Sequence, residues 1–333
     1  MLFLTTALWG TLIAISSYTW MGMWMGLEIN LLSIIPLMNN IKNSMSSESS
    51  IKYFITQAIA STMILLMAII MSYKNFLIMN WFNMNYSSLI FNSALMMKMG
   101  AAPFHFWFPE VMEGLSWMNS FMLLTWQKIA PLILINYNLS SHMFLIIIIL
   151  FSMIISSILG VNQTSLRKIL AYSSINHLGW MISSIMVMET VWIIYFIIYS
   201  LISFNIIILF KMLNTFNLMQ FYLLIKNNKM IKLFFMMNFM SMGGLPPFLG
   251  FFPKWLTIQA LMNNNLELLA ITMLMMTLFT LFYYMRMTFS TMTLMSNETN
   301  FMNHKLMNKN LIFKLNFLMI LMLFITTLVF NLI

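Results

Sequence analysis

Four ionisable residues of this chain are placed where they could do chemistry, each inside a long apolar stretch. They are Glu28, Lys98, Lys128 and Lys254. A lysine in the middle of a membrane-spanning helix costs about 3 kcal/mol on insertion scales, and such residues are usually kept for moving ions or protons. Burial disfavours the charged form of a lysine, so a buried lysine can take up and release a proton. The predicted chemistry is charge transfer across a membrane.

Glu28 is the carboxylate that lies well inside an apolar run, and we expect it to pair with Lys98. Pairing would raise the proton affinity of the lysine, and separating the two groups would lower it. A change in this pair could therefore drive protons along the series of lysines. Each charged residue also has a structural interpretation. It could form a buried ion pair, or its side chain could extend to the membrane interface.

Each lysine has a proline close by in the sequence. Pro103 lies five residues after Lys98, Pro131 lies three after Lys128, and Pro253 directly precedes Lys254. A proline inside a helix removes a backbone donor and frees the carbonyl four residues back, so the helix can break and admit water or polar partners. The stretch 242–247, which has two glycines and ends in Pro246 and Pro247, can hardly continue as a regular helix. Discontinuous helices beside ionisable groups are typical of transport proteins.

Two histidines are candidates for passing protons between the charged groups. His177 lies in the middle of an expected helix, where it could relay protons near neutral pH or serve as a hydrogen-bonded packing residue. His105, Glu110 and Glu113 are expected near the basic side of the membrane. We expect a solvated loop there, with a role in proton uptake as the second interpretation.

The composition is that of an integral membrane protein. Of the 333 residues, 61% are hydrophobic and only 7% are charged, and the mean hydropathy is +0.89. The chain has no cysteine, which excludes disulfides, thiolate metal sites and cysteine nucleophiles. The net charge of +9 would suggest a nucleic-acid partner in a soluble protein, but this chain has no solvated basic face to offer one.

At roughly 20 apolar residues per span, the chain holds on the order of eleven helices. We predict an all-α, polytopic transmembrane helix bundle in one membrane domain over 1–333. The apolar runs place the helices at about 2–20, 22–41, 51–73, 85–105, 115–137, 142–160, 168–187, 190–212, 231–260, 266–288 and 311–332.

Basic residues collect in the loops on one side of this arrangement. The loops on the opposite side hold only Lys74. An excess of lysine and arginine in the loops is typical of the cytoplasmic type of membrane face, so the basic side is predicted to be that face. The N-terminus is then predicted to lie on the basic side and the C-terminus on the other. The basic-side residues are Lys42, Lys52, Arg167, Lys168, Lys211, Lys226, Lys229, Lys232, Arg286, Lys305, Lys309 and Lys314.

The sequence shows no phosphate loop, dinucleotide fingerprint, metal-ligand cluster or nucleophile triad. Its 41 methionines are spread over nearly every expected helix, which is typical of adaptable apolar packing. The spacing of Gly22 and Gly26 favours close helix contact. Any redox chemistry connected with this chain must take place in a partner.

Long strings of residues, in one order, make the chain similar to a known family. They lie at 24–32, 52–57, 98–110, 124–131, 162–180 and 241–255, and include Lys98-Met-Gly-Ala-Ala-Pro-Phe-His-Phe-Trp-Phe-Pro-Glu110. In these segments the sequence closely resembles the chain 2 family of mitochondrial NADH:ubiquinone oxidoreductase, respiratory complex I, in its insect form. The resemblance implies an antiporter-like subunit of the membrane arm.

The resemblance also implies roles for the matching residues. Glu28 and Lys98 would be the coupled acid–lysine pair, Lys128 the central lysine and Lys254 the lysine toward the exit side. The broader antiporter-like family has fourteen helices, and we expect eleven here, without the first three. The route by which protons reach this subunit therefore remains open.

In that family, proton translocation is coupled to NADH oxidation and ubiquinone reduction in other subunits, as NADH:ubiquinone reductase (H+-translocating). No cofactor is expected in this chain, and NADH, FMN, iron–sulfur clusters and ubiquinone are expected in partner subunits. The expected partners are other complex I membrane-arm subunits, including neighbouring antiporter-like chains and accessory subunits, and membrane lipids such as cardiolipin; no nucleic acid is expected. The implied location is the mitochondrial inner membrane, with the basic loops in the matrix.

Two other functions use the same features. A stand-alone cation/proton antiporter would need the same helices and lysines, although a sodium site prefers oxygen ligands and this chain buries one carboxylate against three lysines. A non-pumping structural membrane scaffold would keep the lysines as ion-paired residues.

Overall fold

The computed structural model describes residues 2–40, 43–74, 84–139, 141–225 and 229–293. In these ranges the regular structure is helical, apart from one isolated bridge between Ser165 and Asn217. The all-α prediction is confirmed. The helix expected at 311–332 and most of the basic segment before it lie outside the described residues. The total of eleven spans stays a prediction for that reason.

Six helices of the described ranges are long and apolar enough to cross a membrane. About 20 residues of helix match the roughly 30 Å of hydrocarbon in a bilayer. The spans begin and end at Trp20–Met38, Ser44–Met71, Trp117–Asn136, His142–Val161, Glu189–Leu213 and Glu267–Met292. The chain therefore has the membrane-spanning helices that its composition predicts.

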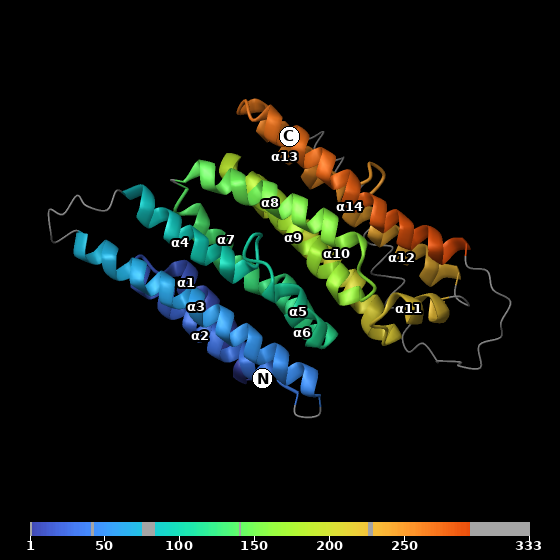
Figure 1. Cartoon of the computed structure of the whole chain (residues 1–333), viewed down its shortest axis with the longest axis horizontal. Helices are drawn as coiled ribbons and strands as arrows, with labels where there is room; N and C mark the ends of the chain where they lie inside the picture. The colour runs from blue at the N-terminus through green and yellow to red at the C-terminus, as the bar shows by residue number, and fades with distance from the viewer. Residues whose placement is uncertain (1, 41–42, 75–83, 140, 226–228, 294–333) are drawn as a thin grey trace. The chain divides into compact units, whose positions relative to one another are not determined.

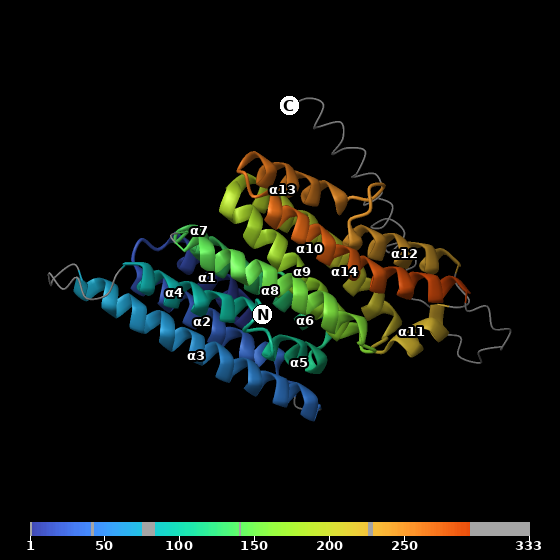
Figure 2. The same ribbon diagram turned by 45° about the horizontal axis from the view of Figure 1, so that its top comes forward.

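The chain divides into two compact units, residues 1–152 and 153–333. The expected single membrane domain stays a prediction. Unit 1 contains α1 (Leu2–Ser16), α2 (Trp20–Met38), α3 (Ser44–Lys74), α4 (Met84–Met99), α5 (Trp107–Gly114), α6 (Trp117–Leu124), α7 (Trp126–Asn136) and the first half of α8 (His142–Val161). Within it, α1, α2 and α3 lie side by side (Figures 1 and 2).

Small residues allow α1 and α2 to approach closely. A Cβ atom added at Gly26 would lie 2.4 Å from the backbone nitrogen of Ala14, and one at Gly10 would lie 2.8 Å from that of Asn30. Such contacts are typical of membrane helices that pack through small residues. Gly22, by contrast, faces the turn between the two helices, at Ser17 and Thr19. The close contact fixes the part of α2 that bears Glu28 and Asn30.

Unit 2 contains the second half of α8, α9 (Leu166–Val187), α10 (Glu189–Leu213), α11 (Leu218–Ile225), α12 (Lys229–Gly243), α13 (Phe251–Asn263) and α14 (Glu267–Thr293). Helix α9 is its central element, because every residue from 169 to 185 is buried. Figure 2 shows α12 and α14 side by side, and the two helices are in contact.

Three stretches that we expected as single helices are each interrupted. The expected helix at 85–105 ends at Met99, where Gly100 has φ +72°, and the one at 231–260 ends at Gly243, where Gly244 has φ +78°. A positive φ ends a helix and is open mainly to glycine. Pro103, Pro246 and Pro247 lie in the segments that follow these glycines.

The third interruption falls earlier than its proline. We expected a break at Pro131, but Pro131 lies inside α7, and the helix is interrupted at Thr125. There the Lys128 amide donates to the Thr125 carbonyl at 3.1 Å, a tighter turn than that of an α-helix. The ring of a proline clashes with the carbonyl four residues back, so the distortion develops on its N-terminal side.

Candidate functional site

Lys98 lies in the last turn of α4, directly before the interruption at Gly100. Its side chain is buried, at 7% exposed. The Glu28 carboxylate of α2 is near enough to influence its charge, but in the described residues the two side chains do not form the expected direct ion pair. Two carbonyls at the end of α4 accept hydrogen bonds from side chains. Gln57 Nε2 donates to the Lys98 carbonyl at 3.2 Å, and Trp107 Nε1 donates to that of Met97 at 3.1 Å. The helix thus ends inside the protein without losing its hydrogen bonds.

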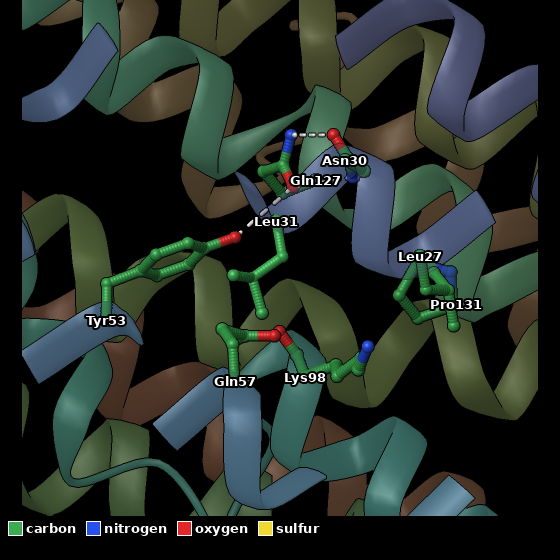
Figure 3. A pocket seen from close by; sticks show the side chains of 8 residues that line it. All are labelled: Leu27, Asn30, Leu31, Tyr53, Gln57, Lys98, Gln127 and Pro131. Atoms are coloured by element: carbon green, nitrogen blue, oxygen red, sulfur yellow. Dashed lines mark hydrogen bonds between the residues drawn. The ribbon is translucent and has the colours of Figure 1, made fainter. Parts of the chain in front are cut away.

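A small polar cavity lies beside Lys98 (Figure 3). Its volume of about 10 Å³ is close to the space that one water molecule needs. Asn30 Nδ2 donates to Gln127 Oε1 at 2.9 Å, and the Tyr53 hydroxyl donates to the same oxygen at 3.4 Å. The lining residues come from α2, α3, α4 and α7: Leu27, Asn30, Leu31, Tyr53, Gln57, Lys98, Gln127 and Pro131. A water molecule here would have several polar partners next to the lysine.

Lys128 lies in the first turn of α7, directly after the interruption at Thr125. It is 1% exposed, and its ammonium nitrogen is 5.3 Å from the centre of the Phe108 ring of α5. A cation at this distance from an aromatic face is attracted by the ring's quadrupole. Gln127, the residue before it, lines the cavity at Lys98. The cavity therefore joins the helix of one lysine to that of the other.

Lys254 lies in the first turn of α13, and its ammonium group turns back to the end of α12. Its Nζ donates to the Gly243 carbonyl at 2.8 Å and to the Met242 carbonyl at 3.4 Å. The C-terminal end of a helix has a negative partial charge and unsatisfied carbonyls, which suit a cation. Lys254 is 5% exposed, and its Nζ lies 5.9 Å from the centre of the Trp180 ring of α9.

His177 is buried in the middle of α9, at 6% exposed. Its Nδ1 lies 2.8 Å from the Tyr195 hydroxyl of α10, and its ring is 5.0 Å from that of Tyr199. The Trp180 ring that Lys254 approaches is one turn further along α9. The structure thus places His177 among hydrogen-bonding groups, and both the relay and the packing interpretations use this geometry.

The residues expected in a solvated loop differ in their exposure to solvent. His105 lies between α4 and α5 but is only 2% exposed, with Nδ1 3.3 Å from the Pro103 carbonyl. The expectation of a solvated histidine is wrong, because the interrupted helix folds this segment into the protein. Glu110 in α5 is exposed and accepts from Lys52 Nζ of α3 at 2.8 Å. Glu113 follows it in the same helix.

Several residues around the lysines were not identified from the sequence. Tyr53 and Gln57 lie four residues apart in an apolar run, a spacing that places both on one face of a helix, and Asn30 and Gln127 are amides in apolar surroundings. These patterns could have been found. The contact of Lys254 with the carbonyls of α12 could not, because it depends on how the chain turns between Gly243 and Phe251.

Interrupted helices beside buried ionisable residues are typical of membrane transport proteins, and comparison with known sequences gives the family. The chain belongs to the family described as NADH:quinone oxidoreductase/Mrp antiporter, TM, whose sequence model matches residues 17–280.

Individual relatives match over nearly the whole chain. The chain is 52% identical over 322 residues to "NADH-ubiquinone oxidoreductase chain 2" of Anopheles gambiae, covering 94% of this chain and 93% of that protein. It is 49% identical over 309 residues to the protein of that name from Locusta migratoria, covering 93% and 90%. For Mus musculus the identity is 40% over 314 residues, covering 91% and 90%.

Solved structures share the fold at low sequence identity. A chain of respiratory complex I from Thermus thermophilus matches with a TM-score of 0.84 at 20% identity, over 96% of this chain and 76% of that one. A chain of the archaeal membrane-bound sulfane sulfur reductase matches with a TM-score of 0.81 at 18% identity, over 98% and 73%. The antiporter-like fold is therefore established for this chain. The absence of the family's first three helices stays a prediction.

Proposed function

We propose that the chain is a membrane-arm subunit of respiratory complex I that translocates protons while other subunits oxidise NADH and reduce ubiquinone. One observation carries the proposal: each of three buried lysines lies at an interruption of a helix. Placing a lysine in apolar surroundings is costly, and helix interruptions supply the polar groups that make a proton-exchanging lysine tolerable there. The relatives that bear the name of chain 2 support this assignment.

Glu28 and Lys98 form the adjustable part of the proposed mechanism. While the two charges interact, Lys98 holds its proton. A movement that weakens the interaction would let the proton leave, since the isolated ammonium is disfavoured in a low-dielectric site. The cavity lined by Lys98 and Gln127 offers the position for a water molecule on the way to α7 and Lys128. Lys254, against the carbonyls of α12, is the lysine of unit 2.

The redox steps belong to other subunits in this proposal. NADH, FMN, the iron–sulfur clusters and ubiquinone are bound there, and the catalysed reaction of the whole assembly is that of NADH:ubiquinone reductase (H+-translocating). The chain resides in the mitochondrial inner membrane, with its basic loops in the matrix and with neighbouring antiporter-like chains, accessory subunits and lipids such as cardiolipin around it. The many exposed apolar side chains on its helices suit such neighbours.

A native gel of mildly solubilised mitochondrial membranes tests the assembly. The gel is stained for NADH dehydrogenase activity and its bands are searched for peptides of this chain by mass spectrometry. We expect the peptides in one very large band together with the activity. Peptides in a small particle without activity would instead favour a stand-alone cation/proton antiporter.

The substitution Lys128→Met tests proton translocation within the assembled complex. We expect a lower ratio of protons moved to NADH oxidised, because the variant removes a buried proton carrier while keeping an apolar side chain of similar length. Lys211→Met, at an exposed lysine of α10, is the matched control and should keep the normal ratio. An unchanged ratio in Lys128→Met would favour the non-pumping scaffold.

A further inference from the structure

Four tyrosines gather in the interior of unit 2, around His177. Tyr195 and Tyr199 come from α10, and Tyr283 and Tyr284 come from α14. All four are 1–2% exposed, and we call them the tyrosine cluster. Tyr195 contacts His177 directly, at 2.8 Å, and both Tyr195 and Tyr199 lie in electrostatic range of Tyr284. The cluster is continuous from the histidine to α14.

More polar residues lie beside the tyrosine cluster, and in each case a residue of α9 interacts with a residue of α14. Asn176 Nδ2 donates to the Thr280 hydroxyl at 3.1 Å, and one turn nearer the start of α9 the Tyr284 hydroxyl interacts with Ser173. Beyond Tyr284 on α14, the Arg286 guanidinium donates to the Val161 carbonyl at the end of α8. The series therefore runs from His177 to the connection between α8 and α9.

That end of unit 2 is basic. Arg167 and Lys168 open α9 there, and Arg286 reaches the same end from α14. His177 lies eleven residues after Leu166, which is about 16 Å along the helix at 1.5 Å per residue. A polar series over this length would connect the buried histidine with the side of the membrane that the sequence predicts to be the basic one.

Several polar atoms in the series are buried without a direct hydrogen bond. In the described ranges these include the hydroxyls of Tyr283 and Tyr284 and the Oδ1 atom of Asn176. The two tyrosine hydroxyls nevertheless interact with each other, and their rings lie 4.5 Å apart. Buried polar groups of this kind are commonly joined by an internal water molecule.

Filling the core does not by itself explain these hydroxyls. Phenylalanine would supply the same ring, as Phe239 does beside Tyr284 at 5.6 Å. A buried hydroxyl without a partner destabilises the fold relative to one that is hydrogen-bonded. The ring of Tyr283 also needs the glycine at the end of α8, because a Cβ added at Gly160 would lie 3.0 Å from it. The hydroxyl groups thus point to a polar role.

We propose that the tyrosine cluster, with Ser173 beside Tyr284, Ser174 beside Tyr199 and bridging water molecules, is a proton branch that connects His177 with the basic end of unit 2. The inference rests on the proposed function and adds the uptake route that the sequence left open. Each hydroxyl passes its own proton to the next acceptor and receives one from the group before it, so the tyrosines stay neutral. When His177 Nδ1 is the acceptor, the Tyr195 hydroxyl is the donor to it, and His177 then releases a proton from Nε2.

Tyr284→Phe in the assembled complex tests the branch, because it removes one oxygen and keeps the ring. In closed vesicles we expect the ratio of protons moved to NADH oxidised to fall to the level of Lys128→Met. The double variant should fall no further, since both residues act in one path. Tyr137→Phe, at a tyrosine that is 54% exposed, is the control and should behave as the unmodified chain.

The outcomes separate the branch from the proposed function. A normal ratio in Tyr284→Phe, with a lowered ratio in Lys128→Met, overturns the branch alone. A normal ratio in both overturns the proposed function and the branch with it. If Tyr284→Phe does not assemble, Ser173→Ala tests the same step: a lowered ratio supports the branch, and a normal ratio overturns it.

Discussion

Lys98 in unit 1 and Lys254 in unit 2 are both buried lysines at the interruption of a helix, yet their polar surroundings differ. The Glu28 carboxylate of α2 acts on Lys98, beside a cavity of the size of one water molecule. Lys254 donates instead to the backbone carbonyls at the end of α12. A carboxylate can gain a proton or change its rotamer, whereas a backbone carbonyl can do neither without unfolding the helix end.

This difference separates two ways of keeping a charge in a membrane. The Lys98 site is adjustable, because its partner belongs to a side chain on another helix, and the Lys254 site is fixed by the fold. A change at Glu28 can therefore alter the Lys98 site, while the environment of Lys254 stays constant.

Gly244→Ala should have the largest effect, because it disturbs the Lys254 site, which is fixed by the fold. A Cβ there would lie 2.7 Å from Lys254 Cδ and 3.0 Å from Nζ, so the end of the lysine side chain must shift from its present position at the carbonyls. The positive φ of +78° adds a cost of about 1–2 kcal/mol for a residue with a Cβ. We expect a lower midpoint of thermal denaturation of the assembled complex, together with a clear loss of pumping.

Gly243→Ala is the matched control for that experiment. A Cβ at Gly243 would meet Tyr284 at 3.6 Å and Leu281 at 3.7 Å, which are ordinary contacts, and the residue keeps its carbonyl. It should leave pumping unchanged. If Gly244→Ala pumps protons as well as Gly243→Ala does, the contact between Lys254 and the end of α12 does not matter for function.

Glu28→Gln should have an intermediate effect, limited to the adjustable site. The variant keeps the shape of the side chain and removes the charge that acts on Lys98. A lost charge interaction of about 1 kcal/mol corresponds to about a fivefold change in the ratio of protonated to neutral lysine. We expect a reduced proton ratio with unchanged thermal stability.

Glu267→Gln, at an exposed carboxylate in the first turn of α14, controls for the loss of a negative charge elsewhere. It should leave the ratio unchanged. A normal ratio in Glu28→Gln would mean that Lys98 needs no acidic partner, and the contrast between the two lysines would then disappear.

The sequence predicted the all-helical fold and the burial of Lys98 and Lys254, because apolar length and a charge inside it are local properties. It also predicted interruptions near the prolines. It placed one of them at Pro131 rather than Thr125, since the clash of a proline acts on the preceding turn and the exact site of relief depends on packing. The glycines with positive φ, Gly100 and Gly244, mark the other two breaks more directly than the prolines do.

Contacts between distant segments could not be predicted in the same way. Nothing local indicates that Asn30 and Gln127 form a hydrogen bond across 97 positions, or that Gln57 donates to the Lys98 carbonyl. The burial of His105 has the same origin, because the segment after Gly100 folds inward instead of continuing as a helix. Such features depend on how helices meet, and a single sequence contains no measure of that.

Lys52→Gln should have the smallest effect. It tests whether exposed charges contribute to the difference between the Lys98 and Lys254 sites. Lys52 contacts Glu48 at 2.9 Å and Glu110 at 2.8 Å, but the three side chains are 41–61% exposed. Exposed ion pairs contribute little because water and salt screen them. The buried side chains of Trp107 and Phe108 hold α5 in place instead.

For Lys52→Gln we expect normal assembly and a normal proton ratio at low and at high salt. A lowered ratio with normal assembly would assign Glu110 and Lys52 to proton uptake, and it would mean that the adjustable site of unit 1 extends from Lys98 to the surface of the protein.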